Sequence, residues 1–142
     1  MFDHEKLNVY QAALRFLEWL NPILEAIPKT FAAHDQLDRA SLSMLLNIAE
    51  GNGKTAVKDR CRFFEMARGS ALECAAILDA LGVKKLISGE QRRDGKLQLE
   101  SVVAMLVGLL RRLDGSRLGE EMGWYSGEQE REQEQEQEHG KE

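Results

Sequence analysis

Apolar residues recur every three or four positions in four stretches of the chain, at about residues 5–27, 34–50, 56–81 and 89–114. This spacing places apolar side chains on one face of a helix, as expected for helices that bury that face. The only two prolines are Pro22 and Pro28, so long helices are favoured after them. The pattern predicts an all-α fold, an antiparallel up-and-down four-helix bundle with short connections.

The apolar stripes differ in width. The third segment has alternating steps of three and four, a heptad pattern, formed by Phe64, Ala67, Ala71, Cys74, Leu78 and Leu81. The first segment has a stripe that includes Tyr10, Leu14, Leu17, Leu24 and Ile27. That stripe is widened by Phe16, Trp19, Leu20 and Ile23. The faces of the first and third segments exceed what one bundle core requires. Because surplus apolar surface generally marks an interface, we expect a homo-oligomer.

Proline, glycine and capping residues mark the expected interruptions and ends. Pro22 lies inside the first stripe and should bend or interrupt that helix, because proline has no backbone N–H. Gly51 is expected to end the second helix in a left-handed conformation. Ser88 and Gln91 have the spacing of a capping box at the start of the fourth helix. Gly95 is expected to delay the regular part of that helix to about residue 96.

The composition fits one domain with a flexible extension. A chain of 142 residues can bury a real core, and an aromatic share of only 6% argues against a sheet protein. The segment 116–142 contains glycines and then repeated Glu-Gln pairs, with few apolar side chains. We therefore expect a bundle domain at 1–115, followed by a Gly-containing linker and a flexible Glu/Gln-rich tail.

Charge is unevenly distributed along the chain. Residues 1–51 carry four Lys/Arg and seven Asp/Glu, a net charge of −3. Residues 52–117 carry thirteen and eight, a net charge of +5, and residues 118–142 carry two and nine, a net charge of −7. The acidity therefore comes mainly from the tail, and the helical body is close to neutral. A free nucleic-acid-binding protein is usually much more basic than this.

The two cysteines, Cys61 and Cys74, lie in the same predicted helix. Thirteen steps along a helix separate them by about 20 Å, which is too far for a disulfide. Both are expected to be small apolar core side chains in a reducing compartment. The first residues lack the pattern of a signal peptide, and no apolar run reaches the length of a membrane span. We therefore expect a cytoplasmic protein without a membrane partner.

Two polar, glycine-bearing motifs interrupt the apolar pattern: residues 47–51, NIAEG, and residues 67–70, ARGS. Polar residues in such places usually join helices to each other. We expect Glu50 and Arg68 to pair between the second and third helices. The alternative is that the carboxylate acts as a general base. Asn47 is expected to be buried and to hydrogen-bond backbone groups, with a ligand contact as its alternative.

Gly69 lies in the middle of the third predicted helix. Glycine there costs about 1 kcal/mol relative to alanine. We expect this cost to be offset by the close approach of a neighbouring backbone, beside the small residues Ala67, Ser70 and Ala71. Gly51 and Gly69 would then both help to fix the packing of the second and third helices.

The candidate reactive residues do not form a recognisable site. His4, His34 and His139 are too scattered for metal-ligand spacing. Residues 51–55, GNGKT, resemble the end of a phosphate loop but lack the leading glycine and a preceding strand. We therefore expect no catalytic, cofactor or metal site, and a protein that is not an enzyme.

Basic residues gather around two predicted connections. The first cluster, at the start of the third helix, consists of Lys54, Lys58, Arg60 and Arg62. The second, around the connection between the third and fourth helices, consists of Lys84, Lys85, Arg92, Arg93 and Lys96. In a bundle these connections lie at opposite ends. Repetition of each cluster in an oligomer would create a ring of charge able to bind phosphates, although solvated surface charge is the simpler interpretation.

Three segments resemble a known family: EKLNVYQAA at 5–13, SMLLNIAEGNGK at 43–54 and RFFEMARGSALE at 62–73. Together they are similar to the small bacterial four helix bundle proteins, also called 23S rRNA-intervening sequence proteins. The resemblance covers about residues 2–115. It implies a left-handed antiparallel four-helix bundle that assembles as a ring-like homopentamer, in a family whose members are largely of unknown function.

The accessory variability determinants of diversity-generating retroelements also resemble this fold. Those proteins have a more basic surface and act with a reverse transcriptase and nucleic acid. This chain departs from them in its near-neutral body and acidic tail, and from the family pattern at Pro22 and over residues 116–142. Two functions remain open: a structural or adaptor protein that self-assembles, and a nucleic-acid or ribonucleoprotein accessory module that binds phosphates through the basic clusters.

Overall fold

The computed structural model describes residues 1–113. In this part the chain forms a short 3-10 helix and four α-helices, with no strand: η1 Asp3–Lys6, α1 Asn8–Ala26, α2 Ala32–Gly53, α3 Val57–Val83 and α4 Gly89–Leu113. The predicted all-α fold is confirmed. The predicted linker and Glu/Gln-rich tail lie outside the described residues.

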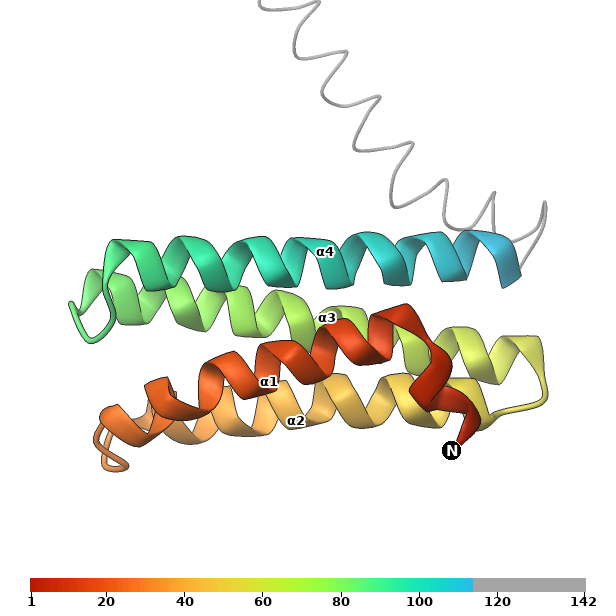
Figure 1. The fold of residues 1–142 in the computed structure, drawn as a ribbon, viewed down its shortest axis with the longest axis horizontal. Helices are drawn as coiled ribbons and strands as arrows, with labels where there is room; N and C mark the ends of the chain where they lie inside the picture. The colour runs from red at the N-terminus through yellow and green to blue at the C-terminus, as the bar shows by residue number, and fades with distance from the viewer. Residues whose placement is uncertain (114–142) are drawn as a thin grey trace, which may run out of the picture. The chain divides into compact units, whose positions relative to one another are not determined.

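Internal contacts divide the chain into two units, Met1–Val107 and Gly108–Glu142. The described part of the second unit consists of residues 108–113, at the end of α4. Within the first unit, successive helices run in alternating directions (Figure 1). The α2–α3 connection lies at one end of the bundle, and the α1–α2 and α3–α4 connections lie at the other. The predicted antiparallel up-and-down order is therefore confirmed, and its left-handedness stays a prediction.

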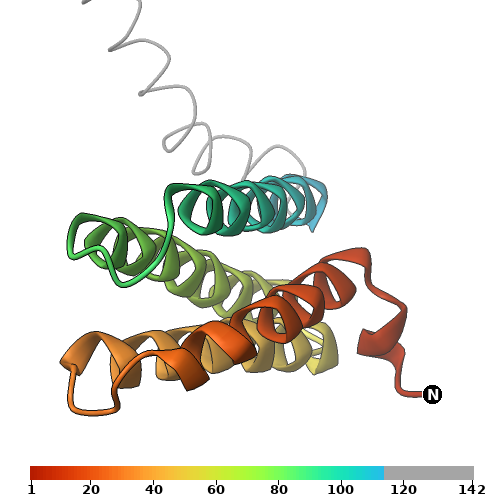
Figure 2. The ribbon, with the colours of Figure 1, turned by 60° about the vertical axis from the view of Figure 1, so that its left-hand side comes forward.

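Both ribbon views show α1 beside α2 and α4 beside α3 (Figures 1 and 2), and we call these neighbours the two helix pairs. The most extensive helix packing is between α2 and α3, which lie along each other and belong to different pairs. Within its pair, α1 approaches α2 over a shorter stretch. The helix η1 folds back onto both α1 and α2. The two members of the α1–α2 pair are thus less tightly joined than α2 and α3.

The core is formed by the apolar faces of the helices, although Tyr10, Leu14, Leu17 and Leu24 of the predicted first stripe are only half-buried. All six residues of the heptad stripe in α3 are buried, as predicted. They pack in a core that also contains Phe16 and Leu20 of α1, Met44 and Ile48 of α2, and Leu99, Val102 and Leu106 of α4. Cys61 and Cys74 are both buried. Burial raises the pKa of the Cys74 thiol to about 12, with the neighbouring Glu73 carboxylate adding to the increase.

Capping residues, Pro22 and Gly51 test the local predictions. At the start of α4, the Ser88 N–H donates to Gln91 Oε1 at 2.8 Å and the Gln91 N–H donates to Ser88 Oγ at 3.0 Å. This is the predicted capping box. Pro22 does not interrupt α1, which continues to Ala26, and the alternative, a bend at Pro22, stays a prediction. Gly51 is not left-handed either, because it lies inside α2, which continues to Gly53.

Three helical glycines have different surroundings. A Cβ atom at Gly51 would lie 2.9 Å from the ring of Phe64, and one at Gly95 would lie 2.6 Å from Leu78 Cδ1 and 2.6 Å from Trp19 Cη2. Gly95 therefore does not delay α4; it lets α4 approach α3 and α1. A Cβ at Gly69 would meet no atom within 4 Å. The predicted close backbone approach at Gly69 is therefore wrong within this chain.

The connection between α3 and α4 contains one residue with an unusual backbone. Lys85 has a φ of 60°, in the left-handed region that non-glycine residues rarely adopt. Its N–H donates to the Gly82 carbonyl at 3.1 Å, and the next N–H, of Leu86, donates to the Leu81 carbonyl at 3.0 Å. These bonds satisfy carbonyls at the end of α3 in the way that a helix-ending left-handed residue does.

Candidate functional site

The NIAEG and ARGS motifs are joined by hydroxyl groups. Asn47 Nδ2 donates to the Ser43 carbonyl at 2.9 Å and to Ser43 Oγ at 3.0 Å. Ser70 Oγ donates to Ser43 Oγ at 3.1 Å, which links α3 to α2. The predicted backbone hydrogen bond of Asn47 is confirmed, but its side chain is half-buried instead of buried as predicted. Ser43 was not predicted from the sequence, although its position one turn before Asn47 on the same helix face is a usable signal.

The ion pair predicted between Glu50 and Arg68 is wrong. Glu50 pairs with Lys54 on its own helix at 3.7 Å, and Arg68 pairs with Glu65 on its own helix at 3.5 Å. Ser70 lies on the side of α3 that faces α2, and Arg68, two residues earlier, lies about 200° around the helix. Arg68 therefore faces away from α2, so the geometry supports no shared acid–base chemistry for the two side chains.

The basic cluster at the start of α3 is built around an aromatic ring. Lys54 Nζ lies 5.1 Å from the centre of the Phe63 ring, and the Arg62 guanidinium carbon lies 5.0 Å from it. These distances are typical of cation–π contacts. Arg60 Nη2 donates to Asn52 Oδ1 at 3.5 Å, and Lys58 is exposed. The cluster exists as predicted, but Lys54 is also paired with a carboxylate.

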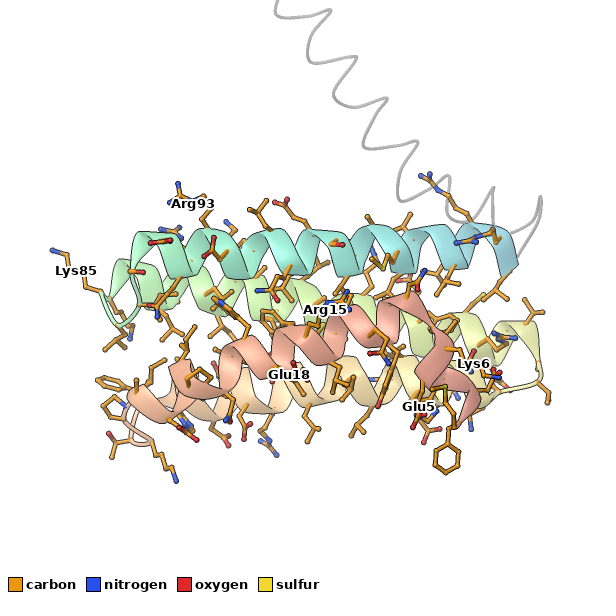
Figure 3. All side chains as sticks on the ribbon, viewed as in Figure 1. Glu5, Lys6, Arg15, Glu18, Lys85 and Arg93 are labelled. Atoms are coloured by element: carbon orange, nitrogen blue, oxygen red, sulfur yellow. The ribbon has the colours of Figure 1, made fainter. Side chains whose placement is uncertain are left out.

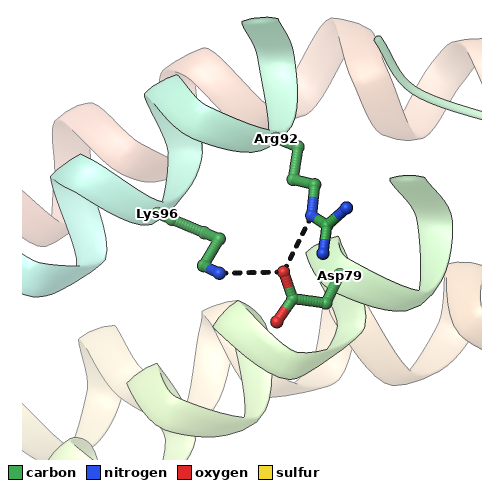
Figure 4. Close-up of polar contacts among 3 residues, drawn as sticks. All are labelled: Asp79, Arg92 and Lys96. Carbon is green, nitrogen blue, oxygen red and sulfur yellow. Dashed lines mark hydrogen bonds and ion pairs between the residues drawn. The ribbon is translucent and has the colours of Figure 1, made fainter. Parts of the chain in front are cut away.

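The basic cluster around the α3–α4 connection splits into two parts. Arg92 Nε and Lys96 Nζ both donate to Asp79 Oδ1, each at 2.9 Å, from α4 to α3 (Figure 4). These bonds, that of Lys96 first, lower the pKa of the Asp79 carboxyl. Lys84, Lys85 and Arg93 are exposed. Asp79 was missed in the sequence, although Arg92 and Lys96 stand one turn apart and together predict an acidic partner.

A groove lies between α1 and α2, with a volume of about 480 Å³. We call it the α1–α2 groove; it is lined by Leu17, Glu18, Leu20, Asn21, Leu24, Asp38, Ser41 and Leu42. Leu42 is 49% exposed, and Leu17 and Leu24 are half-buried. The surplus apolar surface predicted for the first helix is therefore found beside the second helix, along an open seam.

A second, shallower surface lies on the outside of α4, with a volume of about 310 Å³. We call it the α4 face; it is formed by Gly89, Arg92, Arg93, Lys96, Leu97 and Glu100. Leu97 is 57% exposed. Figure 3 shows Arg93 pointing away from the bundle on α4, and Glu18, which lines the α1–α2 groove, on α1. Both surfaces thus combine exposed leucine with charge.

Residues 1–113 contain neither a metal-binding cluster nor a membrane-spanning helix. In this part of the chain, no three His, Cys, Asp or Glu side chains come together in a way that could hold a metal ion. None of the helices in the same part has both the length and the apolar character needed to cross a membrane. Within residues 1–113, the candidate surfaces for function are the α1–α2 groove, the α4 face and the two basic clusters.

Comparison with known proteins places the chain in a family. No curated protein matches it. A solved structure from Bacteroides thetaiotaomicron, described as a protein with unknown function from the S23 ribosomal protein family, is similar in fold, with a TM-score of 0.66 and 22% identity. That match covers 71% of this chain and 96% of the other. The model of the 23S rRNA-intervening sequence protein matches residues 5–108, so the chain belongs to the 23S rRNA-intervening sequence protein family.

Proposed function

We propose that this chain is a structural or adaptor protein, not an enzyme, and that it works as a homo-oligomer. The observation that carries the proposal is the α1–α2 groove, an open seam lined by Leu17, Leu24 and Leu42. Leaving such apolar surface in water is unfavourable, by about 25 cal/mol for each Å² that association could bury. Exposed Leu46, one turn after Leu42 on α2, extends the apolar surface along the same helix.

A pentamer is the copy number that the resemblance to the family implies. Cys61 and Cys74 are buried in one helix and thirteen positions apart, too far to form a disulfide with each other; two such small core cysteines suit a reducing compartment, which supports a cytoplasmic protein. The contacts of the NIAEG and ARGS motifs stay within the bundle, through Ser43 and the Phe64 ring beside Gly51. These contacts support a role of the motifs in holding α2 and α3 together.

Light scattering coupled to size-exclusion chromatography tests the assembly directly. At micromolar concentration we expect a particle about five times the 16.1 kDa mass of one chain. A closed oligomer with another number of copies would contradict the pentamer but not the proposed self-assembly. A single-chain mass at all accessible concentrations would contradict both.

A nucleic-acid accessory module is the second candidate. Its support is the exposed set Lys84, Lys85 and Arg93 at one end of the bundle and the cation–π cluster around Phe63 at the other. Oligomer formation would repeat both sets, and phosphate contacts made by such repeats weaken steeply with salt. Titration of labelled RNA and DNA between about 50 and 200 mM salt tests this function. No binding at the lowest salt would remove it.

A further inference from the structure

The two apolar surfaces of the bundle carry charges of opposite sign. The α1–α2 groove is lined by the carboxylates Glu18 and Asp38 beside its leucines. The α4 face presents Arg93 and Lys96 beside exposed Leu97, together with the single carboxylate Glu100. An apolar patch with an acidic border thus exists on one helix pair, and an apolar patch with a mostly basic border exists on the other.

The same asymmetry holds for the whole of each helix pair. Residues 1–51 carry a net charge of −3, from four Lys/Arg and seven Asp/Glu. Residues 52–107, in the same unit, carry ten Lys/Arg and seven Asp/Glu, a net charge of +3. A neutral body with one acidic half and one basic half attracts a second copy through unlike surfaces, and it repels contact between two like surfaces.

A single chain cannot bring these two surfaces together. Gly95 of α4 faces Leu78 and Trp19 in the interior. Leu97, two residues later, lies about 200° around the helix and therefore points outward. The groove opens along the α1–α2 seam. Contact between Leu97 and the groove must therefore form between different copies.

We infer that the α1–α2 groove of one copy binds the α4 face of the next copy. Leu97 packs against the groove leucines, and Arg93 lies against Glu18 and Asp38. Lys96 contributes less, because Asp79 already binds it at 2.9 Å. This inference rests on the proposed self-assembly and specifies its geometry: the contact joins unlike surfaces head to tail, an arrangement that closes into a ring when the rotation between copies allows.

Three single substitutions at exposed apolar positions test the inference. Leu42→Glu places a charge in the groove, and Leu97→Glu places one on the α4 face. Met66→Glu is the matched control, because Met66 is 42% exposed on α3 and belongs to neither surface. Circular dichroism and thermal unfolding should show that all three variants keep the helical fold. We expect Met66→Glu to assemble like the wild type, and both other variants to be single chains.

Mixing the two defective variants gives the decisive result. The Leu97→Glu chain keeps an intact groove, and the Leu42→Glu chain keeps an intact α4 face. An equimolar mixture should therefore form particles of two chains and stop there, because the remaining surfaces are both blocked. Light scattering at the concentration used for the wild type measures this mass. A contact between two grooves would leave Leu97→Glu fully assembled and would overturn the inference.

A mixture that stays at the single-chain mass would also overturn it. A wild type that is itself a single chain would refute the proposed self-assembly as well, so the two failures can be told apart. As an independent check, Asp38→Lys and Arg93→Glu should each raise the midpoint concentration for dissociation at least about tenfold through like-charge contacts. The chain with both changes should recover most of the loss. No recovery would contradict the head-to-tail pairing of these charges.

Discussion

The seam between α3 and α4 is closed, whereas the seam between α1 and α2 is open. On the closed side, Gly95 lets α4 approach Leu78, and Asp79 of α3 binds two cations of α4. On the open side, leucines on both helices border a groove of about 480 Å³. Apolar side chains alone thus do not close a seam between antiparallel helices. The closed seam has, in addition, a residue without a side chain and charges that reach across it.

The largest expected effect is at the closed seam. Gly95→Ala forces a methyl group to within 2.6 Å of Leu78 and Trp19 atoms. Overpacking costs about 1–3 kcal/mol, and the better helix propensity of alanine returns about 1 kcal/mol. We expect the free energy of unfolding, measured with urea, to fall by up to about 2 kcal/mol. Gly69→Ala is the control and should raise it, because its methyl group meets nothing. Equal effects of Gly95→Ala and Gly69→Ala on the free energy of unfolding would refute the conclusion that Gly95 is closely packed and Gly69 is not.

A somewhat smaller effect is expected where α2 and α3 meet. Ser70→Ala removes the 3.1 Å bond to Ser43 and leaves the Asn47 bonds to Ser43 in place. The loss of one such bond lowers the free energy of unfolding by about 0.5–1.5 kcal/mol. Ser101→Ala, at an exposed position of α4, is the matched control and should be neutral within about 0.5 kcal/mol. A neutral Ser70→Ala would show that packing alone holds these helices together.

The charges across the closed seam should contribute less and should depend on pH. Asp79→Asn removes a carboxylate whose folded pKa is lowered by Lys96 and Arg92. Because the folded pKa lies below the unfolded pKa, the Asp79 carboxylate stabilises the fold at pH values above the unfolded pKa. This stabilisation is lost as the pH falls through the folded pKa. The wild type should therefore exceed the variant in thermal stability at neutral pH, and the difference should vanish in acid. A difference that persists in acid would point to packing. Asp94→Asn, at an exposed position of α4, is the charge-matched control.

The smallest effect is expected at the open seam. Leu42→Ala, made in the Leu97→Glu background that blocks association, should change the free energy of unfolding by less than about 0.5 kcal/mol, because Leu42 is 49% exposed. The same change in the wild-type background should weaken assembly. Urea titration of the first protein and light scattering of the second measure the two outcomes. A large loss of stability in the blocked background would mean that the open seam is part of the core.

Local rules predicted the parts of this fold that depend on neighbouring residues in sequence. The heptad stripe from Phe64 to Leu81 is buried as expected, and the Ser88–Gln91 capping box forms because both partners lie within one turn. The family resemblance from the NIAEG and ARGS motifs is likewise confirmed by the match over residues 5–108.

Features that depend on how helices rotate against each other were not predictable in the same way. The three glycines Gly51, Gly69 and Gly95 look alike in sequence, yet Gly69 alone has open space around it. The pair expected from Glu50 and Arg68 required both to face the same seam, and Arg68 points away from α2. The groove required the apolar edges of α1 and α2 to fall side by side, which the periodicity of either helix cannot show.

The left-handed backbone at Lys85 has a practical consequence. A side chain in this region costs about 1 kcal/mol or more relative to glycine, and the Lys85 side chain itself is exposed. Exchanging it for glycine would relax the loop without disturbing any packed neighbour. The result would be a more thermally stable parent protein. Destabilising substitutions at either seam could then be introduced into this protein, purified and compared at higher temperatures.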